Sequence, residues 1–119
     1  YAQISNMSDP IKVKFRIHFC TPFGQRLAIV GNNPMLGNWK PFEGVQMKFG
    51  FASYWEADVS LEPSTRYLEY KFVIIDENFN TVFWEKGDNR YYNITEKDNG
   101  KTIELFDTWR VSQRYSYFH

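Results

Sequence analysis

The sequence predicts an all-β domain, an antiparallel β-sandwich of immunoglobulin-like size with about eight strands. Short runs in which apolar and polar residues alternate recur along the chain, and clusters of Gly, Pro, Asn and Asp separate them. Phe, Tyr and Trp, which favour strands, make up 19% of the 119 residues. No stretch keeps a helical period. A chain of this length fits one domain with a single core.

The first predicted strand, residues 11–19, is the cleanest in the sequence. Its apolar set alternates with basic residues, as expected for a strand buried on one face; this set is Val13, Phe15, Ile17 and Phe19. His18 falls on the polar face, where a solvated side chain is expected. The second histidine, His119, is not separated from His18 by a spacing typical of metal ligands. The sequence therefore predicts no metal site and no cofactor.

The next segment contains two aromatic residues outside any strand. Residues 21–25 form a predicted turn with Phe23 at its tip, where there is no core for it to enter. A strand over residues 26–31 leads into an irregular loop, residues 32–41, that contains Trp39. Loops rarely bury so large a side chain. Trp39 is therefore either a lid over one end of the core, which its spacing favours, or an exposed platform for a ligand.

Two further strands follow this loop. In the third, residues 45–49, Val45, Met47 and Phe49 alternate with polar residues until Gly50 interrupts the pattern. In the fourth, residues 55–61, Trp55 belongs to the apolar set, so we expect it in the core.

A hairpin is predicted over residues 68–85. Alternation buries one set of side chains and turns Glu69 and Lys71 outward; the buried set is Leu68, Tyr70, Phe72 and Ile74. Residues 76–80 supply the turn. The returning strand carries Trp84 and Glu85 and opens into a polar loop, residues 86–89. An indole, a carboxylate, an ammonium and an amide at one sheet edge suit a neutral polyhydroxylated ligand, although ordinary sheet packing also explains the aromatics.

The predicted domain covers residues 11–110. Two more strands, residues 91–94 and 101–106, flank a turn at residues 97–100, and Trp109 is expected to close one end of the sandwich. Residues 1–10 are read as a linker or arm, and residues 111–119 as a C-terminal extension or linker. Because the chain begins at Tyr1, we expect it to be part of a longer protein.

Charge and cysteine content limit the classes of function. Fourteen basic residues balance fourteen acidic ones, which gives no electrostatic case for binding nucleic acid or an anionic membrane. No apolar run reaches the length of a membrane span. The single cysteine, Cys20, cannot form an internal disulfide, so the fold needs no oxidising compartment; this favours an intracellular protein without establishing its location.

Four motifs, in order along the chain, are typical of one family. They are Gly31-Asn32-Asn33-Pro34-Met35-Leu36-Gly37-Asn38-Trp39, Glu69-Tyr70-Lys71-Phe72, Trp84-Glu85 with Asn89-Arg90, and Asp107-Thr108-Trp109-Arg110. Together they resemble a starch-binding domain of carbohydrate-binding module family 20, over nearly all of residues 11–110. The resemblance implies a non-catalytic sandwich that binds α-1,4-linked glucans such as starch, glycogen, maltooligosaccharides or cyclodextrin. It also implies a covalently linked enzyme that acts on α-glucan.

The resemblance also implies which residues bind the sugar. The first site falls on Trp39, Lys71, Trp84, Glu85 and Asn89, which favours the platform over the lid for Trp39. A possible second site falls on Phe23, where the family commonly has a tyrosine, and on Phe49 and Phe51. Phenylalanine can stack on a sugar but cannot donate a hydroxyl hydrogen bond.

Two other classes of function remain open. An enzyme would need paired carboxylates at a set separation, and Glu85 with Asp88 is the available pair, but the sequence gives no such separation. It also contains no phosphate-binding loop, nucleophile elbow or metal cluster. A protein-interaction sandwich is the second class, because exposed aromatic residues serve protein interfaces as well as sugars.

Overall fold

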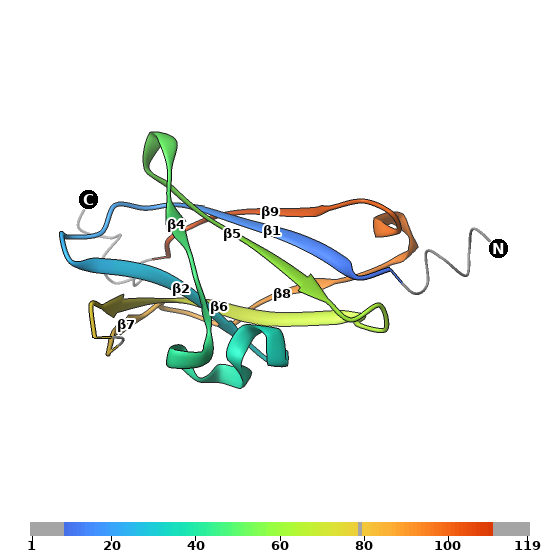
Figure 1. The fold of residues 1–119 in the computed structure, drawn as a ribbon, viewed down its shortest axis with the longest axis horizontal. Coiled ribbons are helices and arrows are strands. Elements are labelled where there is room, and N and C mark those ends of the chain that lie inside the picture. The colour runs from blue at the N-terminus through green and yellow to red at the C-terminus, as the bar shows by residue number, and fades with distance from the viewer. Residues whose placement is uncertain (1–8, 79, 111–119) are drawn as a thin grey trace.

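The computed structural model describes residues 9–78 and 80–110 and shows two β-sheets packed face to face (Figure 1). One sheet has the strand order β4-β5-β1-β9; the other has the order β3-β2-β6-β7, with β8 also paired to β6. The described residues form nine strands: β1 (Ile11–His18), β2 (Gln25–Gly31), β3 (Val45–Gln46), β4 (Lys48–Phe49), β5 (Tyr54–Leu61), β6 (Tyr67–Asp76), β7 (Thr81–Trp84), β8 (Arg90–Asn93) and β9 (Ile103–Thr108). The predicted sandwich is confirmed.

Strand β1 has a neighbouring strand on each side, and one of the two pairings differs from the all-antiparallel sandwich that the sequence predicts. It pairs antiparallel with β5, but it pairs in parallel with β9, with Val13 opposite Ile103. The two strands predicted on either side of residues 97–100 do not pair with each other, because β8 belongs to the other sheet and pairs with β6. The chain crosses between the sheets after β8, so β9 enters beside β1 in the same direction.

The predicted third strand, residues 45–49, is split between the two sheets. Residues Val45–Gln46 pair with β2, whereas Lys48–Phe49 pair with β5. Met47 lies between them with 4% of its surface exposed, and its N–H donates to the Leu27 carbonyl. Alternation alone could not show this crossing, because Met47 points into the core that both sheets share.

The core fills the space between the sheets with the inward residues of both. Phe15, Phe72 and Leu68 have no exposed surface, and Trp55, at 6%, is buried as predicted. His18 is exposed, also as predicted. At one end the half-buried Trp109 packs against the core and stacks on Phe19, with ring centroids 4.7 Å apart.

Short 3₁₀ helices connect several strands of the described chain. They are η1 (Pro34–Trp39), η2 (Pro41–Glu43), η3 (Phe51–Ser53) and η4 (Glu96–Asp98). None of the helices in residues 9–78 and 80–110 is long and apolar enough to cross a membrane. The assignment of residues 111–119, and of most of 1–10, lies outside the described residues.

Candidate carbohydrate-binding site

Strand β6 supplies the polar centre of the candidate site. Its alternate residues, from Leu68 to Ile74, are buried in the core, so Glu69 and Lys71 project from the opposite, outer face of the sheet. The turn that follows forms as predicted, because the Asp76 carboxylate accepts the backbone N–H groups of Asn78 and Asn80 at 2.8 and 2.9 Å. This hairpin directs β7 back along the edge of β6.

Strands β7 and β8 share that edge of β6, and the loop between them borders Lys71. Trp84, the last residue of β7, is opposite Val73, whereas Arg90, the first residue of β8, is opposite Tyr70. The loop of residues 85–89 therefore leaves the sheet beside Lys71. Residues directly opposite in an antiparallel pair share a face, so Trp84 stands on the outer face, where it is 37% exposed.

Trp39 lies on the same outer face, from the other side of β6. Strand β2 pairs with β6 so that Val30 is opposite Lys71 and Ala28 is opposite Val73. The half-buried Trp39 packs against an apolar cluster on this face that includes Ala28, Val30 and Val73. The lid interpretation is wrong, because Trp39 covers the outside of a sheet rather than one end of the core.

The backbone that presents Trp39 has an unusual conformation. Asn38 and Trp39 have φ angles of 47° and 67°, in the left-handed region, which Asn tolerates but a bulky residue such as Trp rarely adopts. Gly37, at φ 76°, lies so close to η2 that an added Cβ would be 2.6 Å from the Glu43 carbonyl carbon. Leu36 anchors the loop in the core with no exposed surface. Backbone strain of this kind persists only where its surroundings impose it, and it concentrates at functional sites.

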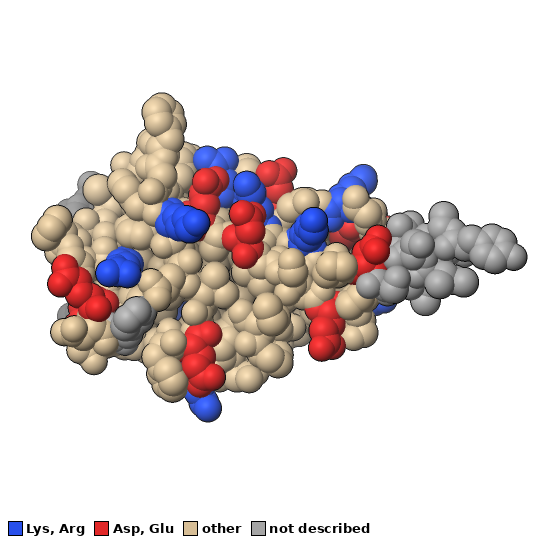
Figure 2. All heavy atoms as spheres, in the orientation of Figure 1, with Lys and Arg blue, Asp and Glu red and all other residues tan. Residues whose placement is uncertain are grey.

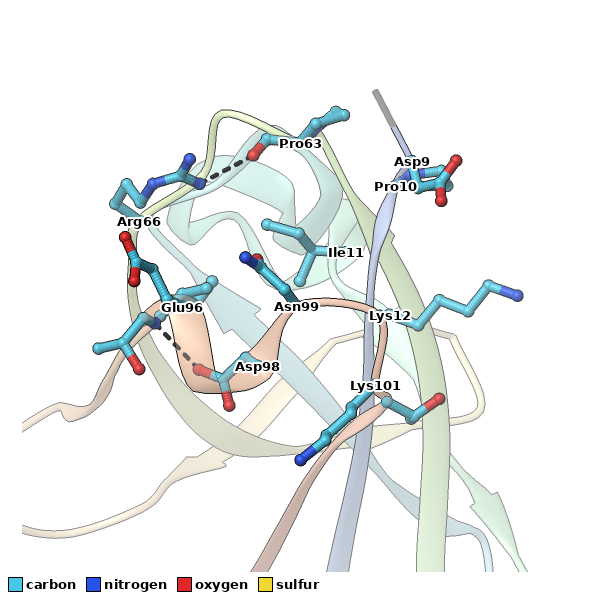
Figure 3. Close-up of a pocket in the computed structure, with 14 residues that line it drawn as sticks. Asp9, Pro10, Ile11, Lys12, Pro63, Arg66, Glu96, Asp98, Asn99 and Lys101 are labelled. Atoms are coloured by element: carbon cyan, nitrogen blue, oxygen red, sulfur yellow. Dashed lines mark hydrogen bonds between the residues drawn. The ribbon is translucent and has the colours of Figure 1, made fainter. Parts of the chain in front are cut away.

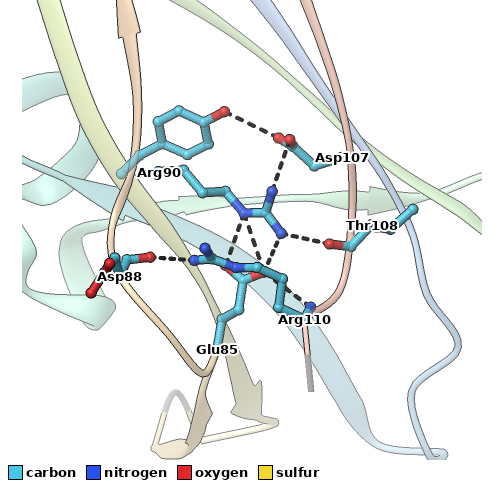
Figure 4. Close-up of polar contacts among 7 residues, drawn as sticks. Glu85, Asp88, Arg90, Asp107, Thr108 and Arg110 are labelled. Carbon is cyan, nitrogen blue, oxygen red and sulfur yellow. Dashed lines mark hydrogen bonds and ion pairs between the residues drawn. The ribbon is translucent and has the colours of Figure 1, made fainter. Parts of the chain in front are cut away.

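The aromatic platform is the outer face of β6 that carries Trp39, Lys71 and Trp84. Glu85 does not lie on it, although the family resemblance implied that this residue binds sugar. It follows the outward Trp84 and points inward, with only 1% of its surface exposed (Figure 4). Its Oε1 accepts from Arg90 Nε at 3.0 Å, and its Oε2 accepts from the backbone N–H of Arg110 at 3.2 Å. The Arg110 side chain also forms an ion pair with it, at 3.4 Å. The carboxylate is thus held within the protein.

Arg90 joins Glu85 to strand β9. Its Nη1 donates to Asp107 Oδ1 at 2.9 Å, and the Tyr70 hydroxyl donates to the other oxygen of Asp107 at 3.1 Å. Burial by itself lowers the pKa of Arg90, but the hydrogen bond and charge of Glu85, followed by the charge of Asp107, outweigh it and raise the pKa. Burial, and then Asp107, raise the pKa of Tyr70. The four charged residues of this cluster balance as two cations and two anions.

This ionic cluster also fixes the loop beside Lys71. Arg110 donates to the backbone carbonyl of Asp88, so the cluster holds both ends and the middle of residues 85–90. Arg90, Asp107 and Arg110 belong to the sequence motifs, but the motifs alone predict no role for them. The available signal in the sequence is that two of the motifs each contain one acidic residue and one arginine.

Asn89 and Glu69 are joined on the outer face. The Asn89 Nδ2 donates to Glu69 Oε2 at 2.7 Å, and the Tyr67 hydroxyl donates to Oε1 at 2.7 Å. These two hydrogen bonds, with that from Asn89 the stronger influence, lower the pKa of Glu69. Glu69 faces outward, as its place in the alternation predicts, but the sequence predicts no function for it.

The three phenylalanines of the possible second site are exposed and lie apart from this face. Phe23, at the β1–β2 turn, and Phe51, in η3, are almost fully exposed, and Phe49 is about half exposed at 53%. The backbone bond from Phe19 N–H to the Ser53 carbonyl joins the segments after β1 and before β5. The β4–β5 connection projects beyond the body of the sandwich (Figure 1).

A hollow of about 1070 Å³ lies at another part of the molecule, where residues 94–102 meet the start of β1 (Figure 3). Its lining includes Arg66, Asp98 and Lys101 but none of the predicted sugar-binding residues. Within the described ranges, no three His, Cys, Asp or Glu side chains are grouped to hold a metal ion. Three of the sequence motifs instead bring Trp39, Lys71 and Trp84 to the outer face of β6.

Comparison with known proteins identifies the family. The family described as starch binding domain matches residues 10–104. The chain belongs to the starch binding domain family, carbohydrate-binding module family 20. Domains of this family are non-catalytic binding modules.

The segments that this starch binding domain matches in its relatives are parts of larger enzymes. The chain is 35% identical over 101 residues to a cyclomaltodextrin glucanotransferase of Geobacillus stearothermophilus, which covers 81% of the chain and 14% of that enzyme. It is 32% identical over 104 residues to a glucoamylase of Neurospora crassa, covering 84% of the chain and 16% of the relative. The chain thus spans about a seventh of the length of these relatives.

Solved structures agree with the fold. A glucoamylase from Hypocrea jecorina superposes with a TM-score of 0.77 at 25% identity, covering 87% of the chain and 18% of that structure. The family 20 module of a maltotetraose-forming amylase from Pseudomonas saccharophila superposes with a TM-score of 0.66 at 23% identity, covering 83% of the chain and all of the module. The second match supports the fold alone.

Proposed function

We propose that this domain binds α-1,4-linked glucans on the outer face of β6 and brings an attached α-glucan-active enzyme to its polysaccharide. Starch, glycogen, maltooligosaccharides and cyclodextrin all offer the required sugar chain. The observation that carries the proposal is the convergence of Trp39, Lys71 and Trp84 on one face of one sheet. The relatives' names, glucanotransferase and glucoamylase, support an α-glucan as the ligand.

The two indoles are proposed as stacking surfaces for sugar rings. The C–H face of a glucose ring is apolar and can cover an aromatic face. Covering one face yields less than the roughly 1.5–3 kcal/mol gained by burying a whole apolar side chain. The register of β7 with β6 sets the position of Trp84, and Trp39 packs against the apolar cluster beside Lys71. We infer that a single sugar chain contacts both indoles and this lysine.

Lys71 and Asn89 are proposed to bind sugar hydroxyls. Lys71 donates only, whereas Asn89 keeps its carbonyl oxygen and a second N–H while one N–H is bonded to Glu69. Each such bond replaces one to water, so its net contribution is about 0.5–1.5 kcal/mol. After the cost of immobilising the ligand, we expect a dissociation constant between about 1 μM and 1 mM.

Glu85 is proposed to support the site from within rather than to touch the sugar. Its bonds to Arg90 and Arg110 hold the loop that carries Asn89. Phe23, with Phe49 and Phe51, is proposed as a second, weaker contact for long chains. Two sites on one domain increase affinity only for a polymer that reaches both.

A protein-interaction module is the remaining alternative, since the same aromatics could contact a protein. On the face shown in Figure 2 acidic and basic side chains are interspersed, without a field of one sign. Native electrophoresis with and without amylopectin in the gel separates the two functions: retardation supports glucan binding, and unchanged mobility contradicts it. Prolonged incubation should also leave maltoheptaose intact by chromatography, whereas shortening or transfer would contradict a non-catalytic role.

A further inference from the structure

The outer face of the sheet carries two more exposed aromatic residues, Tyr67 and Tyr91, which the motifs of the sequence do not include. Tyr67 begins β6 and is 43% exposed; Tyr91 lies in β8 and is 66% exposed. In the β6–β8 register Tyr91 is opposite Glu69 and Tyr67 is opposite Asn93. Because opposite residues share a face and the period of a strand is two, both tyrosines stand on the same side as Lys71.

Tyr67 is joined to the candidate site by hydrogen bonds through Glu69, and Tyr91 lies beside Tyr67. Asn89 donates to one oxygen of Glu69, and the Tyr67 hydroxyl donates to the other, each at 2.7 Å. From Tyr67 to Lys71 the strand advances by four steps, about 13 Å at about 3.3 Å per residue. One surface therefore runs from the indole of Trp84, past Asn89 and Glu69, to the two phenols.

The geometry of the two rings suits a flat ligand. Their centroids are 6.3 Å apart and their planes are inclined by 31°, which is closer to parallel than to perpendicular. Both rings keep a large part of their surface in water. Between them and the site, each Glu69 oxygen accepts one hydrogen bond and retains capacity for another from a sugar hydroxyl.

We propose that Tyr67 and Tyr91 extend the platform and bind further glucose rings of the chain already held at Trp39 and Trp84. This inference rests on the proposed function and adds to it a preference for longer α-glucans. A protein would also fit exposed tyrosines, but the direct continuity through Asn89 and Glu69 favours the same sugar chain. Stacking on this pair should add about 3- to 10-fold in affinity, the range typical of one aromatic contact.

The test compares maltotriose with maltoheptaose by titration calorimetry. All proteins carry Phe23→Ala, so that a long chain cannot gain from the possible second site. The test variant is Tyr67→Thr/Tyr91→Thr, because threonine keeps a high strand propensity. The control is Phe106→Thr, which removes an aromatic side chain of similar exposure, 59%, from β9 in the other sheet.

The parent and the control should bind maltoheptaose more tightly than maltotriose. The double variant should bind maltotriose as the parent does but lose about 3- to 10-fold of its affinity for maltoheptaose. Tyr67→Phe/Tyr91→Phe should keep the length preference, since the rings remain. Unchanged affinity for both sugars in the threonine variant would overturn the extension while leaving the first site intact. Equal losses for both sugars would also overturn it, and a parent that binds neither sugar would contradict the proposed function itself.

Discussion

Replacing Glu85 with glutamine tests whether this carboxylate is an internal support. Its side chain has no exposed surface, and its partner Arg90 is 14% exposed. Glutamine has nearly the same shape, but it loses the charge and brings N–H donors towards the donors of two arginines. The variant therefore leaves a buried cation with less compensation, whereas a surface carboxylate in contact with sugar would leave stability unchanged.

The size of the loss follows from the surroundings of the cluster. Breaking a buried ion pair costs about 3–5 kcal/mol. Here Arg90 keeps its bond to Asp107, and the Arg110 side chain, at 36% exposure, can reach water. We therefore expect a loss of about 2–4 kcal/mol, a large part of the roughly 5–15 kcal/mol that stabilises a domain of this size.

Urea unfolding followed by tryptophan fluorescence measures this loss. With a slope of about 1–3 kcal/mol per molar urea, a loss of about 2–4 kcal/mol should lower the midpoint of Glu85→Gln by about 0.7–4 M. Asp88→Asn is the matched control: it removes the same charge from an exposed side chain in the same loop and should leave the midpoint unchanged. An unchanged midpoint for Glu85→Gln, together with a loss of maltoheptaose affinity as large as that of Trp84→Ala, would refute the support and restore a direct contact.

Three further predictions concern single side chains. Trp84→Ala should weaken maltoheptaose binding more than Lys71→Ala, because the lysine exchanges water for sugar; the reverse order in calorimetry, with folded variants, would show that polar contacts hold the ligand. Phe23→Ala should weaken binding to amylopectin but not to maltotriose; an equal effect on both would remove the bridging second site. Hydrogen bonds lower the pKa of Glu69 in the folded chain, so its stabilisation is complete above the unfolded pKa and is lost as pH falls through the lowered one. Between about pH 6 and about pH 3, the urea unfolding midpoint of the wild type should therefore fall more than that of Glu69→Gln. Equal falls would show that the titration of Glu69 is not linked to folding.

The sequence predicts the strands well because a period of two reports directly which side chains enter the core. This period places Lys71 outward and Trp55 inward, as the structure has them. It fails at Met47, where one apolar run serves two sheets, and at β9, whose parallel pairing depends on a crossover that no local pattern records.

The candidate site shows a similar limit. The same alternation that turns Trp84 outward turns Glu85 inward, but a carboxylate is expected at the surface unless its partners are known. Arg110 lies 25 residues away from Glu85, and Arg90, although only five residues away, is positioned by Asp107, which is 17 residues further along. Tyr67 and Tyr91 meet only through the register of β6 with β8, so no motif could have joined them.

The most direct test of the central claim is a nuclear magnetic resonance titration with maltotriose that follows the indole N–H signals, assigned with Trp39→Phe and Trp84→Phe. If the outer face of β6 is the sugar-binding surface, the signals of Trp39 and Trp84 move together along one saturating curve, with a dissociation constant between about 1 μM and 1 mM. If maltotriose binds while both signals stay still, or if it does not bind at all, the claim is contradicted.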